Sequence, residues 1–372
     1  MQDTEYTEGL LKFIQASPTP FHAVAAMKEI LDSIGYQPLG ESDAWNTVSP
    51  GRYYVTRNDS SIIVFNLAGG LAEKGWRMVG AHTDSPCLKV KPNPETVKKG
   101  YLQLGVEVYG GALLNPWFDR DLSLAGRVSY LCPDGMLRVG LVDFRDPVAT
   151  IPSLAIHLDR DANSQREVNA QTAVVPVLSL FPDTLSPDEK PDFRALLSDR
   201  LQQEHPGIAV REVLDYELSF YDTQGPAVVG LKEEFIASAR LDNLLSCYTG
   251  LQALLQSDGS QSALLVCNDH EEVGSVSAAG AGGPLLKSLI ERLAVDPAGY
   301  AALAEGSMMI STDNAHAIHP NFSDRHDDNH GPVMNGGPVI KVNAGQKYAT
   351  NSETSGLFRM LAAQESVRVQ SF

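Results

Sequence analysis

Two adjacent glutamates, Glu271 and Glu272, directly follow an apolar run in the segment "LLVCNDHEEVGSVS" (residues 264–277). In a regular strand neighbouring side chains point to opposite faces, so the pair could serve one site only from an irregular turn. Buried like charges are costly unless positive charge compensates them, and no Lys or Arg occurs between Arg240 and Lys287. A bound metal ion would supply that charge, which makes a metal site the favoured interpretation.

Further candidate ligands stand at similar positions, immediately after buried strands or before a helix. They are His82 and Asp84 after "WRMVGA", Asp313 after "SMMIS", and Asp242 in "SARLDNLL". In open α/β sheets ligands bind beyond the carboxyl ends of the strands, so the fold can bring these side chains to one edge. Carboxylates and one imidazole are the natural ligand supply of a zinc pair whose ions lie about 3.5 to 4 Å apart.

Three of these residues also have a purely structural interpretation. Asp242 precedes a predicted helix and could cap it, because Asp is a preferred N-cap residue. Asp84 could close a turn before Pro86, and His82 could be a buried histidine whose hydrogen bonds are satisfied by its neighbours. The sequence leaves these interpretations open beside metal binding.

The spacing of apolar residues predicts the elements that would position such a site. Residues 7–36 show helical spacing interrupted by a Pro-rich turn, residues 51–70 indicate a hairpin, and residues 76–86 indicate a buried strand that runs into polar residues. Helices are predicted over residues 242–257, 283–295 and 352–364, and strands over residues 262–268, 307–314, 337–343 and 367–372. This alternation indicates a sheet covered by helices.

A block of different character interrupts the alternation. From residue 95 to residue 230, apolar and polar residues alternate at period two between Gly, Pro and Asp turns, which is typical of antiparallel β structure. We therefore predict an α/β fold with a central mixed sheet covered by helices. Residues 1–92 plus 233–372 would form this catalytic domain, and residues 93–232 would form an inserted β-rich domain.

The composition excludes several classes of protein. In 372 residues, 29 Lys and Arg stand against 46 Asp and Glu, a formal charge of -17, which disfavours nucleic-acid and anionic-membrane partners. No apolar window approaches the roughly 20 residues of a membrane span, and the acidic start "MQDTEYTEGLLKFIQ" is unlike a secretory signal. Four cysteines without a CxxC pair indicate reduced thiols, so we expect a cytoplasmic protein.

Nine motifs spread along the chain carry a family resemblance. They are "SPTPFHA", "RNDSS", "AHTDSP", "WFDRDLSLAGR", "SARLDNLLS", "NDHEEVGS", "STDNAHAIHPN", "NGGPVIKVN" and "QKYATNS", in this order. The set resembles the aspartyl aminopeptidases, which are dinuclear zinc exopeptidases, and the resemblance covers essentially the whole chain. It implies a metalloaminopeptidase that hydrolyses the peptide bond after an acidic N-terminal residue, Asp or also Glu.

Carried over to this sequence, the resemblance implies two zinc ions per subunit, bridged by Asp242. His82 and Asp313 would complete one zinc site, and Glu272 would bind the other. Members of the family continue beyond the position of Phe372 with a Gly-rich segment and a final His that ligates the same zinc as Glu272. No residue of this sequence takes that role, so either the natural chain is longer or the protein lacks one ligand. We expect the second zinc to bind weakly, and a chain of this length to be impaired.

The resemblance also implies the catalytic groups. Glu271 would be the general base that takes a proton from the zinc-bridging water as it attacks the scissile carbonyl, and would later protonate the leaving amine. Asp84 would hold the His82 imidazole in one tautomer through the ring nitrogen that does not bind zinc. The two glutamates would then have different roles, Glu272 binding zinc and Glu271 transferring protons.

Four substrate-binding residues are implied in the same way, namely His157, His316, Lys341 and Tyr348. Because the net charge repels acidic peptides, specificity must be local, and Lys341 is the candidate cation for the substrate carboxylate. The alternative for Lys341 is a lysine extended to solvent at a strand end. His157 would reach the site from a neighbouring subunit, which predicts a homo-oligomer assembled through the β-rich insert. Its alternatives are a surface or core histidine and a less favoured metal ligand.

Two other functions remain open at this point. One is an inactive, assembly-forming homologue, which the missing ligand suggests. The other is a dinuclear aminopeptidase or amidohydrolase with a different substrate preference. A separate metal site in the histidine-rich run "HAIHPNFSDRHDDNH" (residues 316–330) is disfavoured, because its spacings lack a helix or strand frame, and a substrate-facing loop is favoured instead.

Overall fold

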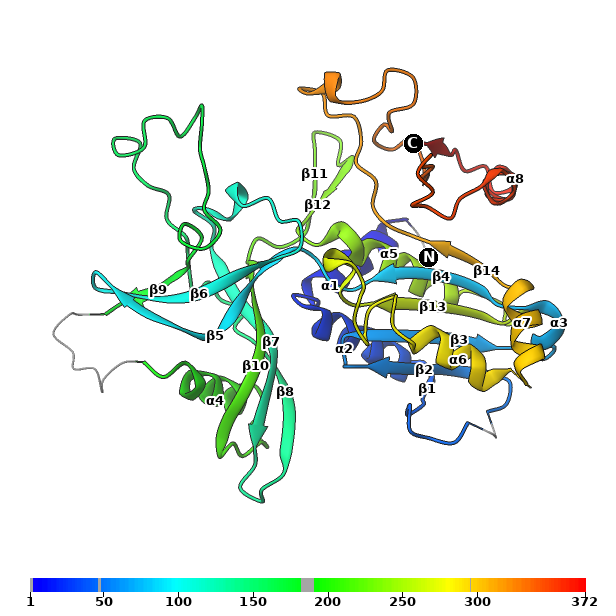
Figure 1. Cartoon of the computed structure of the whole chain (residues 1–372), viewed down its shortest axis with the longest axis horizontal. Helices are drawn as coiled ribbons and strands as arrows, with labels where there is room; N and C mark the ends of the chain where they lie inside the picture. The colour runs from blue at the N-terminus through cyan, green and yellow to red at the C-terminus, as the bar shows by residue number, and fades with distance from the viewer. Residues whose placement is uncertain (1–2, 46–47, 182–190, 295) are drawn as a thin grey trace. The chain divides into compact units, whose positions relative to one another are not determined.

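The computed structural model describes residues 3–45, 48–181, 191–294 and 296–372 (Figure 1). The chain divides into two compact units, Met1–Thr312 and Asp313–Phe372. The larger unit contains two six-stranded sheets, and the smaller unit contains a two-stranded sheet and a long helix. Within the described ranges, no helix combines the length and the apolar character that crossing a membrane requires.

The first sheet is mixed, with the strand order β1-β2-β3-β13-β4-β14. Its strands are β1 (Gln37–Pro38), β2 (Gly51–Arg57), β3 (Ser61–Leu67), β4 (Arg77–His82), β13 (Ala263–Asn268) and β14 (Met308–Ser311). The predicted hairpin is confirmed as the antiparallel pair β2 and β3, whereas β13 and β14 both run parallel to β4. The carboxyl ends of β4, β13 and β14 therefore meet at one edge, as the candidate ligands require.

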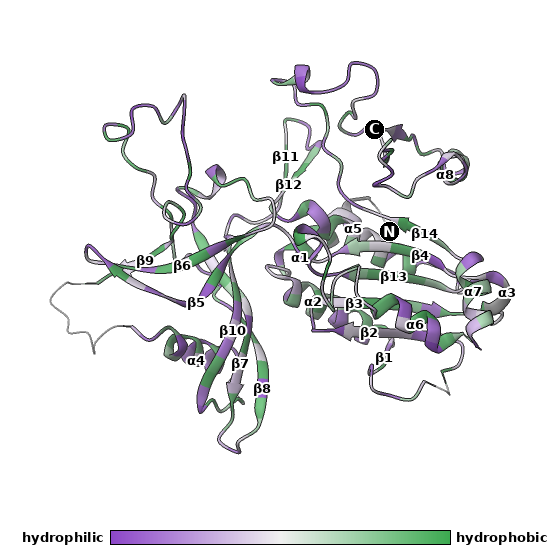
Figure 2. Cartoon of the chain, in the orientation of Figure 1, coloured by the Kyte–Doolittle hydropathy of each residue, from purple (hydrophilic) through white to green (hydrophobic). Residues whose placement is uncertain are grey.

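Helices cover both faces of this sheet, which confirms the predicted mixed α/β architecture. The helices are α1 (Asp3–Gln15), α2 (Pro20–Ser33), α3 (Leu71–Lys74), α5 (Leu241–Leu255), α6 (Leu285–Leu293) and α7 (Pro297–Glu305). On β3, Ile62 and Val64 are buried in one cluster with α1, α2 and α5, while Ile63 and Phe65 are buried in another with α6 and α7. Both faces of the strand are thus apolar, and Figure 2 shows this hydrophobic centre in green.

The second sheet is antiparallel and lies between β4 and α5 in the sequence. In sheet order its strands are β8 (Leu137–Asp143), β7 (Leu122–Leu131), β10 (Glu212–Asp222), β5 (Cys87–Lys98), β6 (Tyr101–Tyr109) and β9 (Val177–Leu180), and the hairpin β11 (Ala227–Val229) and β12 (Phe235–Ala237) follows. Buried side chains such as Leu104, Val128 and Leu218 form a separate apolar cluster. The predicted boundary at residue 93 falls inside β5, and the role of residues 93–232 as an assembly domain stays a prediction.

Three helices were not predicted from the sequence: the four-residue α3, α4 (Phe193–Glu204) and α7. Helices α4 and α7 each begin at an aspartate N-cap: Asp192 accepts hydrogen bonds from two backbone N–H groups of α4, and Asp296 accepts one from α7. On α4, Phe193, Leu197 and Leu201 bury one face at helical spacing. The strand-like residues around α4 obscured this signal. The predicted helix over residues 283–295 is α6, and residue 295 lies outside the described residues.

The smaller unit, Asp313–Phe372, contains β15 (Val339–Ile340), α8 (Ser352–Gln364) and β16 (Gln370–Ser371). Helix α8 confirms its prediction and begins with a capping box between Asn351 and Thr354. The strands predicted over residues 337–343 and 367–372 were expected in the central sheet, but β15 and β16 pair in parallel with each other. That expectation was wrong because an alternating pattern identifies an extended segment without specifying its partner strand. A short 3-10 helix of this unit is η4 (Ser323–Arg325), and another, η1 (Asn115–Trp117), lies in the larger unit.

Candidate metal centre

The ends of β4 and β13 lie side by side because the two strands pair in parallel, with Asn268 opposite His82. The contact extends beyond the strands, since the Thr83 N–H donates to the Asn268 carbonyl at 2.7 Å. After β13 the chain turns through the short 3-10 helix η3 (Glu271–Val273), which the left-handed residue His270 precedes. The paired glutamates therefore stand in an irregular turn, as their shared task requires, and next to the residues that follow β4.

Asp84 is the buried anchor of this turn, with 1% of its surface exposed. Its carboxylate accepts hydrogen bonds from the backbone N–H groups of Glu271 at 3.1 Å and Glu272 at 3.0 Å, and from the Tyr109 hydroxyl at 2.7 Å. Burial alone would raise the pKa of Asp84, but hydrogen bonds from His82, Tyr109 and the Glu272 backbone lower that pKa below its ordinary value. Asp84 therefore does more than close a turn, because as a carboxylate it holds both glutamates in place.

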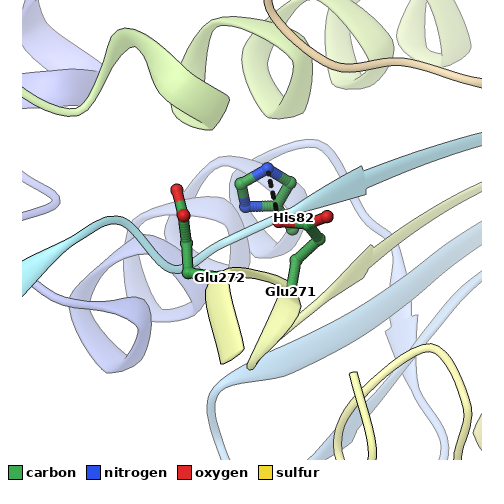
Figure 3. Close-up of side chains that lie close together, drawn as sticks. All are labelled: His82, Glu271 and Glu272. Carbon is green, nitrogen blue, oxygen red and sulfur yellow. Dashed lines mark ion pairs between the residues drawn. The ribbon is translucent and has the colours of Figure 1, made fainter. Parts of the chain in front are cut away.

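The His82 imidazole is buried, and its two ring nitrogens face different groups. Nδ1 lies 3.1 Å from the backbone carbonyl oxygen of Asp84 and 3.3 Å from its Oδ1, while Nε2 lies 3.3 Å from Asp242 Oδ1 and 3.8 Å from Glu271 Oε2. Figure 3 shows His82, Glu271 and Glu272 close together, and one ligand atom of each lies within 4.8 Å of the others. A histidine with a purely structural role does not account for this gathering of carboxylates.

Asp242 stands near the start of α5, where the sequence left a capping role open. The N-cap position belongs to Arg240, and no side-chain cap is formed there. The backbone carbonyl of Asp242 accepts a hydrogen bond from the Ser85 hydroxyl at 2.6 Å, while its half-exposed carboxylate faces the His82 ring. The side chain of Asp242 is thus directed to the candidate site and not to the helix terminus.

Negative charge accumulates around the imidazole. The pKa of Glu272 is raised to about 7, first by burial and next by nearby carboxylates, of which Asp242 contributes most. Among the described residues, Asp242, Glu271 and Glu272 form no ion pair with a Lys or Arg side chain. A cation bound between these groups would relieve their repulsion, as the sequence suggested.

The donor set fits zinc. Zinc in proteins takes imidazole nitrogen and carboxylate oxygen ligands, and a ligating histidine usually has its other ring nitrogen held by a carboxylate or carbonyl. Here Asp84 holds Nδ1 of His82 and leaves Nε2 facing Asp242 and Glu271. The side chains of this edge are therefore suited to hold a zinc ion, whereas the division of the ligands between two ions stays a prediction.

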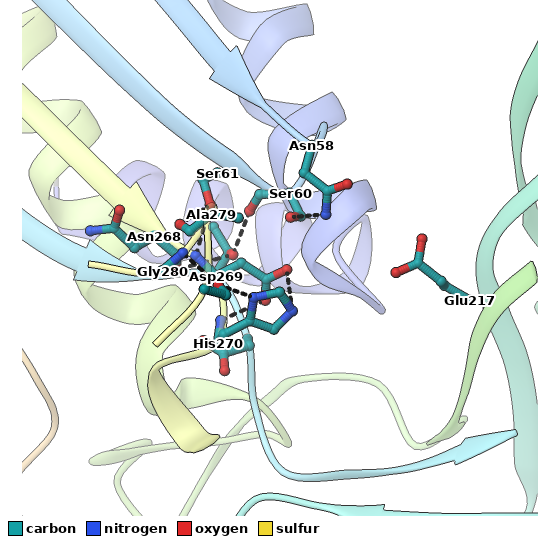
Figure 4. A network of polar contacts seen from close by, with 12 residues as sticks. Asn58, Ser60, Ser61, Glu217, Asn268, Asp269, His270, Ala279 and Gly280 are labelled. Atoms are coloured by element: carbon teal, nitrogen blue, oxygen red, sulfur yellow. Dashed lines mark hydrogen bonds and ion pairs between the residues drawn. The ribbon is translucent and has the colours of Figure 1, made fainter. Parts of the chain in front are cut away.

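A polar network behind η3 supports the glutamate turn and was not predicted from the sequence (Figure 4). Asp269 is buried, its backbone N–H donates to the Ser61 hydroxyl at 2.9 Å, and its carboxylate accepts the His270 backbone N–H at 2.8 Å. The His270 Nδ1 in turn lies 2.8 Å from the Ser277 hydroxyl. The sequence pattern that could have predicted this network is the polar pair Asp269 and His270 directly after a buried strand. The metal-site interpretation used only the adjacent glutamates.

Asp313 opens the smaller unit, immediately after Thr312. Within this unit its Oδ2 lies 2.7 Å from Lys341 Nζ, and Lys341 also donates to the Asn314 carbonyl at 3.0 Å. The Lys341 side chain is 19% exposed, so it is not a lysine extended to solvent. The predicted zinc ligand and the predicted substrate cation therefore form an ion pair, which sequence analysis did not anticipate.

The other predicted substrate-binding residues are exposed side chains in irregular segments. His157 lies in the loop that follows Thr150 in the larger unit, so it is not a core histidine. In the smaller unit, the His316 ring packs edge-on against Phe372 with 4.8 Å between ring centroids, and Tyr348 lies between β15 and α8. The roles of these three residues in binding substrate stay predictions.

Comparisons with known proteins give one consistent result. The family described as aminopeptidase I zinc metalloprotease (M18) matches residues 13–372. A protein of Pseudomonas entomophila (strain L48), named probable M18 family aminopeptidase 2, is 59% identical over 366 residues, which are 98% of this chain and 84% of that protein. A cryo-EM structure of the Ape4 and Nbr1 complex matches with a TM-score of 0.94 and 37% identity, over 99% of this chain and 74% of that one. The structure of the S. cerevisiae mApe1 dodecamer matches with a TM-score of 0.80 and 26% identity, over 98% of this chain and 84% of that one.

Proposed function

The chain belongs to the aminopeptidase I zinc metalloprotease (M18) family, and from this premise we propose that it releases acidic residues, Asp and also Glu, from peptide N-termini with two zinc ions bound per subunit. The observation that carries the proposal is the buried His82, with Asp84 on one ring nitrogen and carboxylates facing the other. That arrangement matches the residue types that a zinc aminopeptidase requires.

In this proposal His82, Asp242 and Asp313 would hold one zinc ion, and Asp242 and Glu272 would hold the other. Asp313 directly follows Thr312, whose backbone N–H donates to the Gly80 carbonyl of β4 at 2.7 Å. Bound zinc would polarise the scissile carbonyl and lower the pKa of the attacking water. The raised pKa of Glu272 supports its role as a metal ligand. Burial and neighbouring carboxylates disfavour its ionised form, and a bound cation would favour that form.

Glu271 is the proposed general base. Its carboxylate is half exposed and lies 3.8 Å from the His82 ring, while its backbone is fixed by the hydrogen bond to Asp84. It would accept a proton from the attacking water and donate one to the departing amine. Asp84 would act on both glutamates through the backbone and on His82 through Nδ1, without touching the substrate.

Acidic specificity is proposed to rest on Lys341, with His157, His316 and Tyr348 completing the substrate contacts. The formal charge of -17 gives a long-range field that repels acidic peptides, so a local cation is needed to bind them. The similar mApe1 of S. cerevisiae is a dodecamer, and this supports a homo-oligomer here. Exposed His157 is then available to reach the site of a neighbouring subunit. Four free cysteines are consistent with a cytoplasmic enzyme.

Removal of the metal tests the proposed activity. Purified protein is expected to release aspartate from an aspartyl peptide faster than leucine from a leucyl peptide. A chelator should lower the aspartyl rate by at least about 100-fold, and added zinc should restore it, because zinc supplies several kcal/mol of transition-state stabilisation. Zinc bound without turnover of either peptide would support the inactive homologue. Equal rates on both peptides would support a different substrate preference.

Replacement of Lys341 by Ala tests the source of specificity. We expect kcat/KM for the aspartyl peptide to fall about 30-fold, because a charge-assisted hydrogen bond to the substrate is lost, and the leucyl rate to be unchanged. The exposed Lys347 of the same unit provides the matched control, Lys347→Ala. Zinc content must be measured for both variants, since Lys341 also pairs with Asp313. An equal loss on both peptides would contradict the assignment.

A further inference from the structure

Tyr109 belongs to the second sheet but contacts the metal centre of the first. It is the last residue of β6, and β6 is paired with β5 so that Tyr109 lies opposite Cys87. Because β5 begins three residues after Asp84, this register returns Tyr109 to the end of β4. There its hydroxyl donates to Asp84 Oδ2 at 2.7 Å.

The Tyr109 side chain is held in a defined place. Burial, followed by the hydrogen bond to Asp84, raises the pKa of Tyr109, so the hydroxyl stays protonated and acts as the donor. Lys89 Nζ lies 5.3 Å from the centroid of the ring, and the His270 ring lies 6.5 Å from it. The ring is thus positioned by its own sheet and by the residue that precedes the glutamate turn.

The next residue supports the same contact independently. Gly110 has a left-handed φ of +69°, and a Cβ placed there would lie 3.0 Å from Glu272 Cβ. A side chain at residue 110 would strain the left-handed backbone and crowd Glu272, so glycine favours this close approach. The end of β6 therefore packs directly against a proposed metal ligand.

Both oxygens of Asp84 are engaged, and the Tyr109 hydroxyl is one of their donors. Oδ1 faces His82 Nδ1 and accepts the Glu271 N–H, whereas Oδ2 accepts the Glu272 N–H and the Tyr109 hydroxyl. A carboxylate can rotate about its terminal torsion at low cost, because that torsion is broad. The tyrosine hydroxyl holds Oδ2, whereas the imidazole faces Oδ1.

We propose that Tyr109 is a positioning residue for the metal centre. It orients Asp84, and through Asp84 it orients both the His82 imidazole and the turn that carries Glu271 and Glu272. The second sheet then shapes the site within a single chain, in addition to any role in assembly. The catalytic part of this inference rests on the proposed function, whereas its effect on zinc binding does not depend on the substrate.

The test is the isosteric change Tyr109→Phe, which removes one hydroxyl from the site. We expect the zinc dissociation constant, measured by competition with a chelating dye, to rise about tenfold. We also expect kcat on the aspartyl peptide to fall about tenfold with KM within twofold of wild type. The control is Tyr54→Phe, because the buried Tyr54 donates to the carboxylate of Asp32 at 2.8 Å, in another tyrosine–carboxylate pair that is remote from this site in the sheet order. The control should change neither quantity.

A double-mutant cycle tests whether Tyr109 affects zinc binding through Asp84. If Tyr109 acts through Asp84, Tyr109→Phe should change zinc affinity less than twofold in an Asp84→Asn background. Zinc affinity and kcat within twofold of wild type for Tyr109→Phe would overturn the proposal, and so would a full tenfold loss of affinity in both backgrounds. Since zinc affinity is measured without peptide, a failure of the proposed acidic specificity would leave this result interpretable.

Discussion

Replacing Glu271 by Gln is expected to lower kcat on the aspartyl peptide by about 10³-fold, with KM and the folded structure unchanged. Glutamine keeps the size of the side chain and the backbone hydrogen bond to Asp84, but it does not accept a proton from the attacking water. The Glu271 side chain is half exposed, so its replacement leaves the packing of the larger unit intact. The loss should therefore appear in the chemical step alone.

Zinc content separates two roles that the geometry allows for Glu271. Its Oε2 lies 3.8 Å from His82 Nε2, and one of its oxygens lies within 4.8 Å of the ligand atoms of His82 and Glu272. If Glu271 is the base and not a ligand, Glu271→Gln retains its zinc at wild-type affinity. The matched control is Glu291→Gln, because Glu291 is similarly exposed on α6 and pairs with Lys287. Loss of zinc together with activity, or a kcat above one tenth of wild type, would contradict the assignment.

Replacing Asp84 by Asn is expected to damage zinc binding and stability together. The buried carboxylate accepts three hydrogen bonds and faces Nδ1 of His82, and an amide would turn an N–H group toward at least one of these donors. We expect zinc affinity to fall about 100-fold, because the glutamate turn loses its acceptors, and the imidazole loses the carboxylate beside Nδ1 although it keeps the Asp84 backbone carbonyl. In chelator, the free energy of unfolding should fall by about 2 kcal/mol, because a buried donor is left without its acceptor.

The second sheet offers a matched control for this variant. Asp143 accepts a hydrogen bond from the Tyr221 hydroxyl at 2.6 Å and from the Arg145 backbone N–H at 3.1 Å, which resembles the bonding of Asp84. Asp143→Asn should therefore lower stability without changing zinc affinity. Stability is compared in chelator so that bound metal does not contribute to it. Equal zinc affinities for the two variants would show that Asp84 has only a structural role.

The parts of the site that could be predicted share one physical basis. His82 ends a strand whose apolar run marks it as buried, and Asp84, Glu271 and Glu272 follow such strands. Parallel neighbouring strands end at the same edge. Local sequence therefore indicated both the residues and their meeting place. The repulsion between adjacent glutamates, with no Lys or Arg near them in the sequence, indicated a bound metal ion from the sequence alone.

Other features depended on contacts between distant parts of the chain. The hydrogen bond from Tyr109 to Asp84 joins two sheets and arises from the register of β5 and β6, which apolar periodicity does not report. The ion pair of Lys341 with Asp313 likewise depends on the path that the chain takes from Asp313 to Lys341. Neither contact leaves a local pattern in the sequence.

The mixed α/β architecture, the family and the chemical types at the strand ends could all be inferred from the amino-acid sequence. These follow from burial, which sets the spacing of apolar residues, and from charge, which must be compensated where it is buried. Three features became apparent only in the folded chain. Asp84 binds the glutamate turn as well as facing the imidazole, Tyr109 donates to Asp84 while Gly110 packs against Glu272, and β15 and β16 pair with each other. Hydrogen bonds and close packing choose specific partners, and those partners are known only once the chain has folded.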